Sequence, residues 1–158
     1  MTHKLRINLI LVVIVALLAL LVWQSQPQPT ALLSRLVAAE ISHITISHGR
    51  DNLNMRLEQG QWLIDDQPGL TSRIEQLLTI SQTPSLNRFP APSDLSPFGL
   101  KNPAIVLQLN QERFSFGDID PLNGWRYVLY NGMIHLIGNG YHHHLTAPLD
   151  AWLEHPDA

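Results

Sequence analysis

Residues 40–64 read EISHITISHGRDNLNMRLEQGQWLI, and the alternation within this stretch decides the predicted fold. Ile44 and Ile46 alternate with polar neighbours, and Leu53 and Met55 do the same further along. A period of two is typical of a half-buried strand, because successive side chains point to opposite faces of a sheet. Short polar turns separate the apolar runs. We therefore predict an antiparallel meander of three strands, over residues 40–48, 53–58 and 61–64.

A helix is predicted directly after this meander, over residues 72–81. Ser72 and Glu75 have the spacing of a capping box, in which the two side chains satisfy free backbone N–H groups at a helix start. The apolar side chains that follow recur at helical spacing and would form one face against the sheet. These side chains are Leu70, Ile74, Leu77 and Leu78.

The chain then runs through a proline-rich connection, residues 83–103, into a second set of strands. Asn131-Gly132 between two β-rich runs is the strongest short signal for a hairpin turn. We predict strands over residues 104–109, 113–116, 125–130 and 133–137, and then a helical end over residues 140–154 that Pro148 interrupts. The predicted fold class is α+β, with antiparallel strand meanders and packed helices in two loosely similar strand–helix units.

An apolar run stands before this domain. Residues 9–23 read LILVVIVALLALLVW, and Lys4 and Arg6 precede them. A membrane-spanning helix needs about 20 mostly apolar residues, and basic residues at its short end keep that end in the cytoplasm. We therefore predict a cytoplasmic N-terminus over residues 1–6, a transmembrane anchor over residues 7–23, a linker or short helix over residues 24–39 and an extracytoplasmic α+β domain over residues 40–158.

A cleaved signal peptide is the alternative to the anchor. It would end in small residues at its cleavage site, whereas Leu21 and Trp23 are bulky. Both interpretations place the domain outside the cytoplasm, which is the periplasm in a bacterium with two membranes. Residues 30–39 also have two interpretations, a short helix next to the membrane or the start of the domain itself.

Composition excludes several classes of function. The chain has 10 Lys and Arg, of which Lys4 and Arg6 precede residue 23, so the remainder carries eight basic against 13 acidic residues. A nucleic-acid-binding protein would carry a basic stripe, and we therefore expect no nucleic-acid partner. The chain has no Cys, which excludes disulfides, thiol catalysis and lipoprotein acylation.

Two polar clusters could bind a metal ion. His142, His143 and His144 are consecutive, and His135 lies on the preceding predicted strand. A selective metal site needs ligands that converge from separate elements, and consecutive residues point in different directions. Whether this run binds metal stays open from the sequence; solvated histidines are the favoured interpretation.

Asp118 and Asp120 have the spacing that opens a calcium loop. An EF-hand loop also needs a central Gly and a closing Glu, whereas Pro121 and Leu122 stand at the centre here. A polar turn between strands is therefore favoured. We predict no resident cofactor and no metal ligand.

Nothing in the sequence predicts catalysis. Ser42-His43 and Ser47-His48 could suggest a nucleophile and its base, but neighbours on a strand point to opposite faces, so we expect no hydrogen bond within either pair. A hydrolase would need Ser, His and a carboxylate within hydrogen-bonding distance. The sequence has no nucleophile elbow and no phosphate-binding loop. We expect a protein that is not an enzyme.

Aromatic residues are the candidates for partner contacts, because aromatic side chains dominate protein interfaces. Trp62 is predicted to lie in the core. The residues that we single out as partner-binding candidates are Phe98, Trp125, Tyr127 and Tyr130. We expect Tyr130 to be the most exposed of the set, because it borders the Asn131-Gly132 turn.

An ordered set of short marks, none specific by itself, covers nearly all of the chain after residue 40. The marks are Ile44-x-Ile46, Gly60-x-Trp62-x-Ile64 with Pro68, the helix over residues 72–81, Asp94-Leu95 with Phe98-Gly99-Leu100-x-x-Pro103, Phe116-Gly117 and Trp125-x-Tyr127-Val128. In this order they resemble a bacterial family of membrane-anchored domains of unknown function. Longer members of that family often accompany ABC-transporter permeases and auxiliary components of the gliding-motility type. The chain resembles a short member with a single copy of the unit.

The resemblance implies a single-pass protein of the cytoplasmic (inner) membrane that works within an envelope assembly. We expect a non-enzymatic accessory or scaffold domain that binds another cell-envelope protein, with an ABC-type transport permease or auxiliary subunit as the partner that the resemblance suggests. The membrane lipid would contact the N-terminal helix. The alternative is an extracytoplasmic module that binds a small envelope ligand, either a glycan or a metal ion; such a module would show a pocket with converging polar groups.

Overall fold

The computed structural model describes residues 11–18 and 31–154. The chain divides into two compact units, residues 1–30 and residues 31–158. In the first unit, residues 11–18 are helical. No helix among the described residues is long and apolar enough to cross a membrane. Most of the cytoplasmic N-terminus, anchor and linker predicted from the sequence lies outside the described residues, so the anchor stays a prediction.

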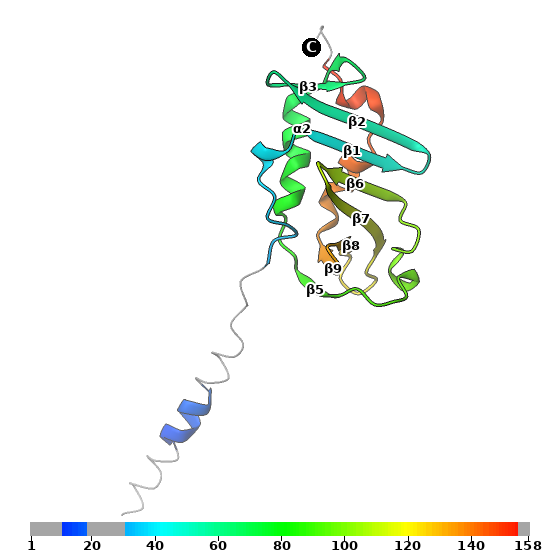
Figure 1. The fold of residues 1–158 in the computed structure, drawn as a ribbon. Helices are drawn as coiled ribbons and strands as arrows, with labels where there is room; N and C mark the ends of the chain where they lie inside the picture. Colours follow the sequence, from blue (N-terminus) through cyan, green and yellow to red (C-terminus); the bar gives the residue numbers. More distant parts are fainter. Residues whose placement is uncertain (1–10, 19–30, 155–158) are drawn as a thin grey trace, which may run out of the picture. The chain divides into compact units, whose positions relative to one another are not determined.

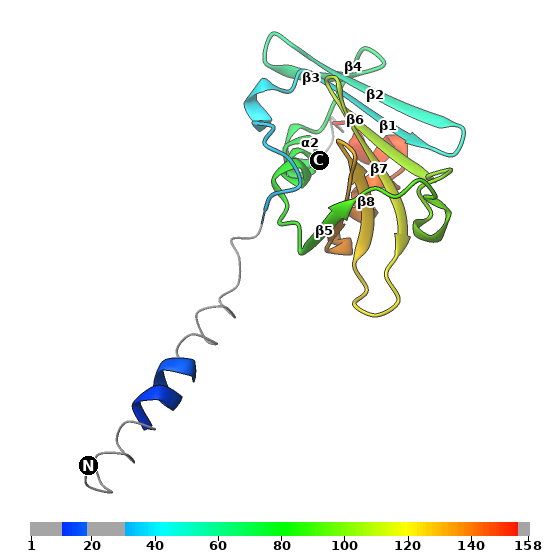
Figure 2. The same cartoon turned by 60° about the horizontal axis from the view of Figure 1, so that its bottom comes forward.

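The second unit is an α+β domain built on one antiparallel sheet. Nine strands of the described residues form it, in the order β4-β3-β2-β1-β6-β7-β8-β9-β5. The strand directions rotate strongly from β3 to β9 (Figures 1 and 2), as expected for a twisted sheet. The strands are β1 (His43–His48), β2 (Asp51–Glu58), β3 (Gln61–Ile64), β4 (Gln67–Pro68), β5 (Asn87–Pro90), β6 (Ile105–Leu109), β7 (Glu112–Ile119), β8 (Arg126–Tyr130) and β9 (Met133–Ile137).

The two predicted meanders are joined into this one sheet through β1 and β6, where Ile46 pairs with Leu107. The helices are few and short. They are α2 (Thr71–Leu78) and α3 (His142–Leu145), with the 3-10 turns η1 (Ala38–Glu40), η2 (Thr79–Gln82), η3 (Ser96–Phe98), η4 (Asn139–Tyr141) and η5 (Leu149–Trp152).

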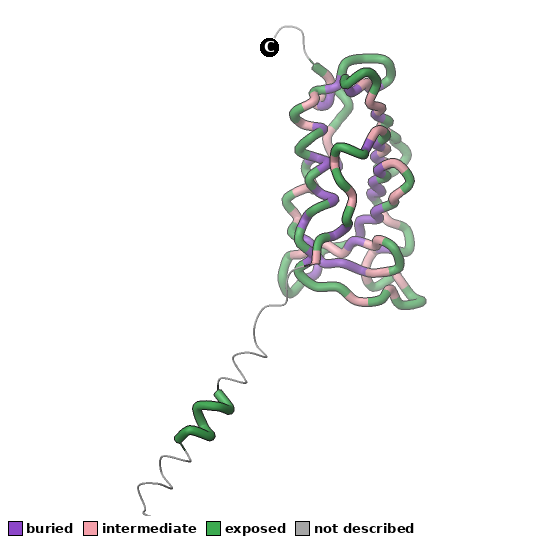
Figure 3. The backbone as a smooth tube through the Cα atoms, turned by 60° about the vertical axis from the view of Figure 1, so that its left-hand side comes forward, coloured by how far each residue is buried: buried purple, intermediate pink, exposed green. Residues whose placement is uncertain are grey.

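A single apolar core connects α2, the C-terminal segment and the inner face of the sheet. Ile74 of α2 is fully buried, and its Cδ1 lies beside Gly69 and the Ile64 side chain. Trp62 is also buried, which confirms its predicted place in the core. Figure 3 shows buried positions alternating with exposed ones along the helix and the strands. These are the periods expected from the sequence.

The start of α2 differs from the prediction. Leu70 is the N-cap and no side chain caps the helix, so Ser72 lies inside the first turn and the predicted capping box does not form. The reason is that the two residues before the helix form hydrogen bonds to distant parts of the chain. The Gly69 N–H donates to Trp62 O and the Leu70 N–H donates to Trp152 O, and these bonds fix the chain one step earlier.

Residues 31–37 are not helical, and the second interpretation of this stretch, the start of the domain, is the one found. Leu33 is buried in the core, and the Ser34 hydroxyl donates to Ser81 O at 2.9 Å. The Leu33 N–H donates to Thr83 O. The packed body therefore begins at about residue 31 rather than at residue 40.

Two other expectations needed correction. The proline-rich connection contains a strand, β5, which pairs with β9. In place of the predicted C-terminal helix over residues 140–154, the structure has three short elements in succession, η4, α3 and η5. Pro148 disfavours helical geometry at the residue before it, and η5 begins only after it.

The connection between β5 and β6 packs closely on β7. A Cβ atom at Gly117 would overlap the carbonyl oxygen of Phe98 and would lie 2.8 Å from Leu100 Cγ. Glycine at residue 117 therefore permits an approach that any side chain would prevent. Gly99, the C-cap of η3, has φ +66° and lies against the Asp118 carboxyl group.

Both edges of the sheet are short. The edge strand β4 has two residues and contains Pro68, and the other edge strand, β5, ends at Pro90. Short edge strands and edge prolines discourage pairing with a strand of another chain. Recognition of a partner by strand addition therefore has little support in this fold.

Candidate functional site

The aromatic candidates do not form one surface. The Phe98 ring meets the Tyr127 ring edge-on, with centroids 5.1 Å apart, and it also contacts the Phe89 ring at 5.6 Å. These three side chains come from β5, η3 and β8 and are all half-buried. Edge-on aromatic pairs of this kind stabilise their packing beyond the area they bury. The cluster lies on the face of β8 opposite to Val128, which is in the core.

Tyr130 belongs to the other face of β8. Its ring stacks on Phe114, which is fully buried, at a centroid distance of 4.5 Å. Tyr130 packs against the main core and is half-buried, as Phe98, Trp125 and Tyr127 are, so the expectation that it is the most exposed of the four stays a prediction. Burial, with a hydrogen bond and charge from Glu112, raises the pKa of the Tyr130 phenol.

The loop between β7 and β8 is closed by the Asp120 carboxylate. Asn123 Nδ2–H donates to Asp120 Oδ2 at 2.8 Å and the Asn123 backbone N–H donates to the same oxygen at 3.2 Å. The Tyr127 hydroxyl donates to Oδ1 at 3.3 Å. Backbone bonds complete the closure, because the Asp120 N–H donates to Trp125 O at 2.6 Å and the Gly124 N–H donates to Asp120 O at 2.9 Å.

The hydrogen bonds of Asp120 decide between the two interpretations of Asp118 and Asp120, a calcium loop and a polar turn. Asp120 is buried, and its oxygens accept hydrogen bonds from its own loop, so it serves to close a polar turn. The hydrogen bond from the Asn123 side chain is the main cause that lowers the pKa of Asp120. Asp118 is exposed and lies over Gly99. The two carboxyl groups have separate structural roles.

The same loop presents an apolar side chain to solvent. Leu122, at its tip, is 88% exposed. Trp125 follows at the base of the loop and is half-buried, and Tyr127 ties the aromatic cluster to the loop through Asp120. We call Phe98, Leu122, Trp125 and Tyr127 the loop face. Three of its four members were predicted from the sequence, and Leu122 was not named as a contact.

The histidine run is not uniformly solvated. His143 is exposed and His142 is half-buried, whereas His144 is only 8% exposed. The prediction of three ordinary solvated residues was therefore wrong for His144. Burial is the first cause that lowers the pKa of His144, and the charges of His143 and Arg73 act in the same direction. In the part of the chain that the structure describes, no group of three His, Asp or Glu side chains could hold a metal ion.

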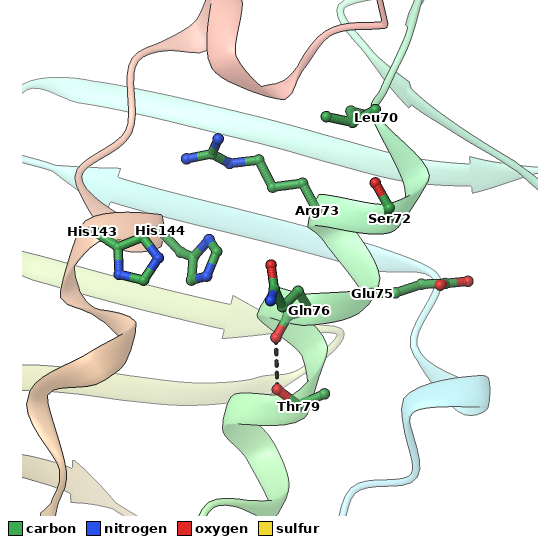
Figure 4. A pocket seen from close by; sticks show the side chains of 8 residues that line it. All are labelled: Leu70, Ser72, Arg73, Glu75, Gln76, Thr79, His143 and His144. Carbon is green, nitrogen blue, oxygen red and sulfur yellow. Dashed lines mark hydrogen bonds between the residues drawn. The ribbon is translucent and has the colours of Figure 1, made fainter.

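His143 and His144 line a hollow of about 640 Å³ between α3 and α2 (Figure 4). Arg73 and Gln76 come from the helix side, and Figure 4 shows both histidine rings reaching toward that helix while Glu75 points away. The Arg73 guanidinium lies over the Trp152 ring, 4.9 Å from its centroid. This arrangement gathers hydrogen-bond donors from three separated segments.

Polar atoms of two residues that line the hollow, and of the Trp152 ring under Arg73, have no partner. Arg73 Nε, His144 Nδ1 and Trp152 Nε1 are buried and make no hydrogen bond within the described structure. Buried polar groups are nearly always satisfied, and each unsatisfied group costs about 1–3 kcal/mol. One signal of this site is present in the sequence, namely the spacing of Arg73 and Gln76, which places both on one side of the helix. Their proximity to Trp152 and His144 could not be read from it.

His135 lies apart from the run, on β9. It is buried and its Nδ1 lies 2.9 Å from Ser85 Oγ. Burial and the nearby charge of Arg88 lower its pKa. It therefore does not join the other histidines.

The pair Ser42-His43 departs from the expectation. Ser42 Oγ lies 3.0 Å from His43 Nδ1, so the predicted absence of a hydrogen bond within this pair was wrong. The reason is that Ser42 precedes β1 and is not bound to the strand alternation. Asn110 Oδ1 accepts hydrogen bonds from both backbone N–H groups at 3.0 and 3.1 Å, and this pairing ties the strand start to the β6–β7 turn.

The chain was also compared with known proteins. It matches no family model, no curated protein and no solved structure. The resemblance drawn from its sequence marks therefore stays a prediction.

Proposed function

We propose that this chain is a membrane-anchored accessory domain that binds another cell-envelope protein through the loop face. The anchor spans residues 7–23, and the domain after it works outside the cytoplasm. The partner class follows from the sequence resemblance, which favours an ABC-type transport permease or auxiliary subunit. The function is binding and positioning rather than catalysis.

The observation that carries this proposal is the exposed Leu122 on a loop that Asp120 holds in shape. A single exposed leucine is ordinary on a protein surface. Leu122 differs because it precedes Trp125 in the same loop, and because that loop is bonded to Tyr127 of the aromatic cluster. Aromatic side chains with a preorganised backbone suit an interface, because little conformational entropy is lost on binding.

The experiment is co-purification from intact membranes with a tagged full-length chain. We expect a discrete membrane protein to co-purify with the wild type. Leu122→Ser and Trp125→Ser should each reduce its recovery by about five-fold or more, the effect of losing an interface contact worth at least about 1 kcal/mol. Leu149→Ser is the matched control, because Leu149 is an exposed leucine of η5, outside the loop face.

The proposal fails if the chain is recovered alone, or if the control variant loses the partner as completely as the two loop variants do. A second result would correct the partner class. If the co-purified protein is a periplasmic soluble enzyme rather than a membrane component, binding stands and the association with transport is wrong.

A further inference from the structure

The hollow between α2 and α3 is lined by polar side chains that do not belong to the loop face. Most of its polar lining can donate hydrogen bonds: the Arg73 guanidinium, the His143 and His144 rings, the Gln76 amide and the Ser72 and Thr79 hydroxyls. Arginine has donors only and stays charged in proteins. Glu75 is the carboxylate of this lining, and its side chain points away from the two histidine rings (Figure 4).

Arg73 has no carboxylate partner within the described residues. The ion pairs of the described residues both belong to Arg56, which bonds to Glu58 and Asp66. Arg73 instead lies over the Trp152 ring, which holds its planar fork in place at the wall of the hollow. A fixed guanidinium suits recognition of a planar or tetrahedral oxyanion by two parallel hydrogen bonds.

The unsatisfied buried atoms point to a ligand of the same kind. His144 is more than nine-tenths buried, it lines the hollow, and its Nδ1 has no partner. Arg73 Nε, on another residue of the lining, is unpaired as well, and so is Trp152 Nε1, on the ring under the Arg73 guanidinium. Arginine and tryptophan nitrogens donate and never accept, so the group that satisfies them must be an acceptor. A cation would meet Arg73 at close range and is disfavoured.

We propose that the hollow between α2 and α3 binds a small oxyanion, a phosphate or carboxylate group, with Arg73 and His144 as its main contacts. The site is separate from the loop face and does not depend on the proposed partner. Its ligand can be a free ion or the charged end of a larger molecule, and both present the same oxygens.

The test is an NMR titration of the full-length chain in neutral detergent micelles, followed at the Trp152 indole N–H and the His144 ring. The probes are inorganic phosphate and acetate, and sodium chloride at equal ionic strength is the control. We expect saturable shifts with a Kd on the order of 1 mM for at least one oxyanion and no saturable shift with chloride.

Arg73→Gln should weaken binding by about ten-fold or more, because it removes the charge and the paired donors. Arg113→Gln removes an equal charge from an exposed position of β7 and should leave the Kd unchanged. Phosphate binding without acetate binding would assign a phosphate ligand, and the reverse would assign a carboxylate.

Absence of a shift with both probes overturns the proposal. So do shifts that chloride reproduces, or shifts of equal size in Arg73→Gln. The wild-type titration against chloride is decisive without any variant, so a failure of Arg73→Gln to fold would not protect the proposal. Loss of the loop-face partner would leave these shifts in place.

Discussion

Gly117→Ala tests the packing that builds the loop face. The added Cβ would overlap Phe98 O and lie 2.8 Å from Leu100 Cγ, and contacts nearer than 3.0 Å force an atom to move. The nearest obstacle is a backbone carbonyl that follows the Pro97 turn, and backbone yields less easily than the end of a side chain. We expect η3 to move away from β7 and to carry the Phe98 ring with it.

The change in the free energy of unfolding of Gly117→Ala is the sum of two opposing effects. Overpacking in a closely packed site costs about 1–3 kcal/mol, and the backbone contact places Gly117→Ala near the upper value. Replacing Gly by Ala also restricts the unfolded chain, which stabilises by about 0.4–1 kcal/mol. The net loss is about 2 kcal/mol in the free energy of unfolding. For a chain of this length it lowers the Tm by roughly 4–8 °C.

The assay is denaturant unfolding of the full-length chain in detergent, followed by the near-UV signal of the buried Trp62 and Trp152. Gly138→Ala is the matched control, because a Cβ at residue 138 meets nothing within 4 Å and its φ is −60°. The control should be unchanged or slightly more stable. Equal unfolding midpoints for the two variants would refute the close packing of residues 98–100 on β7.

Three further predictions concern the core, the histidines and the anchor. Ile74→Ala should lose about 2–5 kcal/mol of unfolding free energy, because it empties a fully buried position, whereas Gln76→Ala on the exposed side of α2 should stay within about 0.5 kcal/mol; equal losses in urea unfolding would contradict the orientation of the helix. Burial lowers the pKa of His135 and of His144, so the unfolded chain takes up more protons below the ordinary histidine pKa of about 6.5. The free energy of unfolding should therefore be fully present above about pH 7 and fall as the solution is acidified toward pH 5, and a flat profile between these values would contradict the burial. A reporter that works only in the cytosol, fused after Ala158, should stay inactive, and activity there would reverse the predicted orientation.

The local elements could be predicted because alternation is a local signal. The strand with Ile44 and Ile46 and the hairpin at Asn131-Gly132 both form as expected. β5 was missed because it contains Asn87, Arg88 and Pro90, which hide any alternation, and because its partner is the distant strand β9. Helix α2 was found, but a bond from Leu70 to Trp152 set its first residue.

In the candidate surfaces too, local placement could be predicted from the sequence and contacts between distant segments could not. The separation of Tyr130 from Tyr127 could have been predicted, since an odd spacing on one strand places side chains on opposite faces. The contacts between Phe98 and Tyr127 and between Arg73 and Trp152 could not, because each joins segments far apart in the sequence. Burial of His144 depends on the α3 turn, which the run of three histidines does not reveal.

Site-specific photo-crosslinking at residue 122 in intact cells identifies the protein that lies against the Leu122 side chain, and so examines partner binding by the loop face without purification. With a photoreactive residue in place of Leu122, we expect a single adduct with a membrane protein of the envelope. The same residue in place of Gln61, an exposed position of β3 outside the loop face, should give none. A chain that forms no adduct at residue 122 at normal expression, or forms the same adduct at both positions, would show that the loop face does not bind a partner.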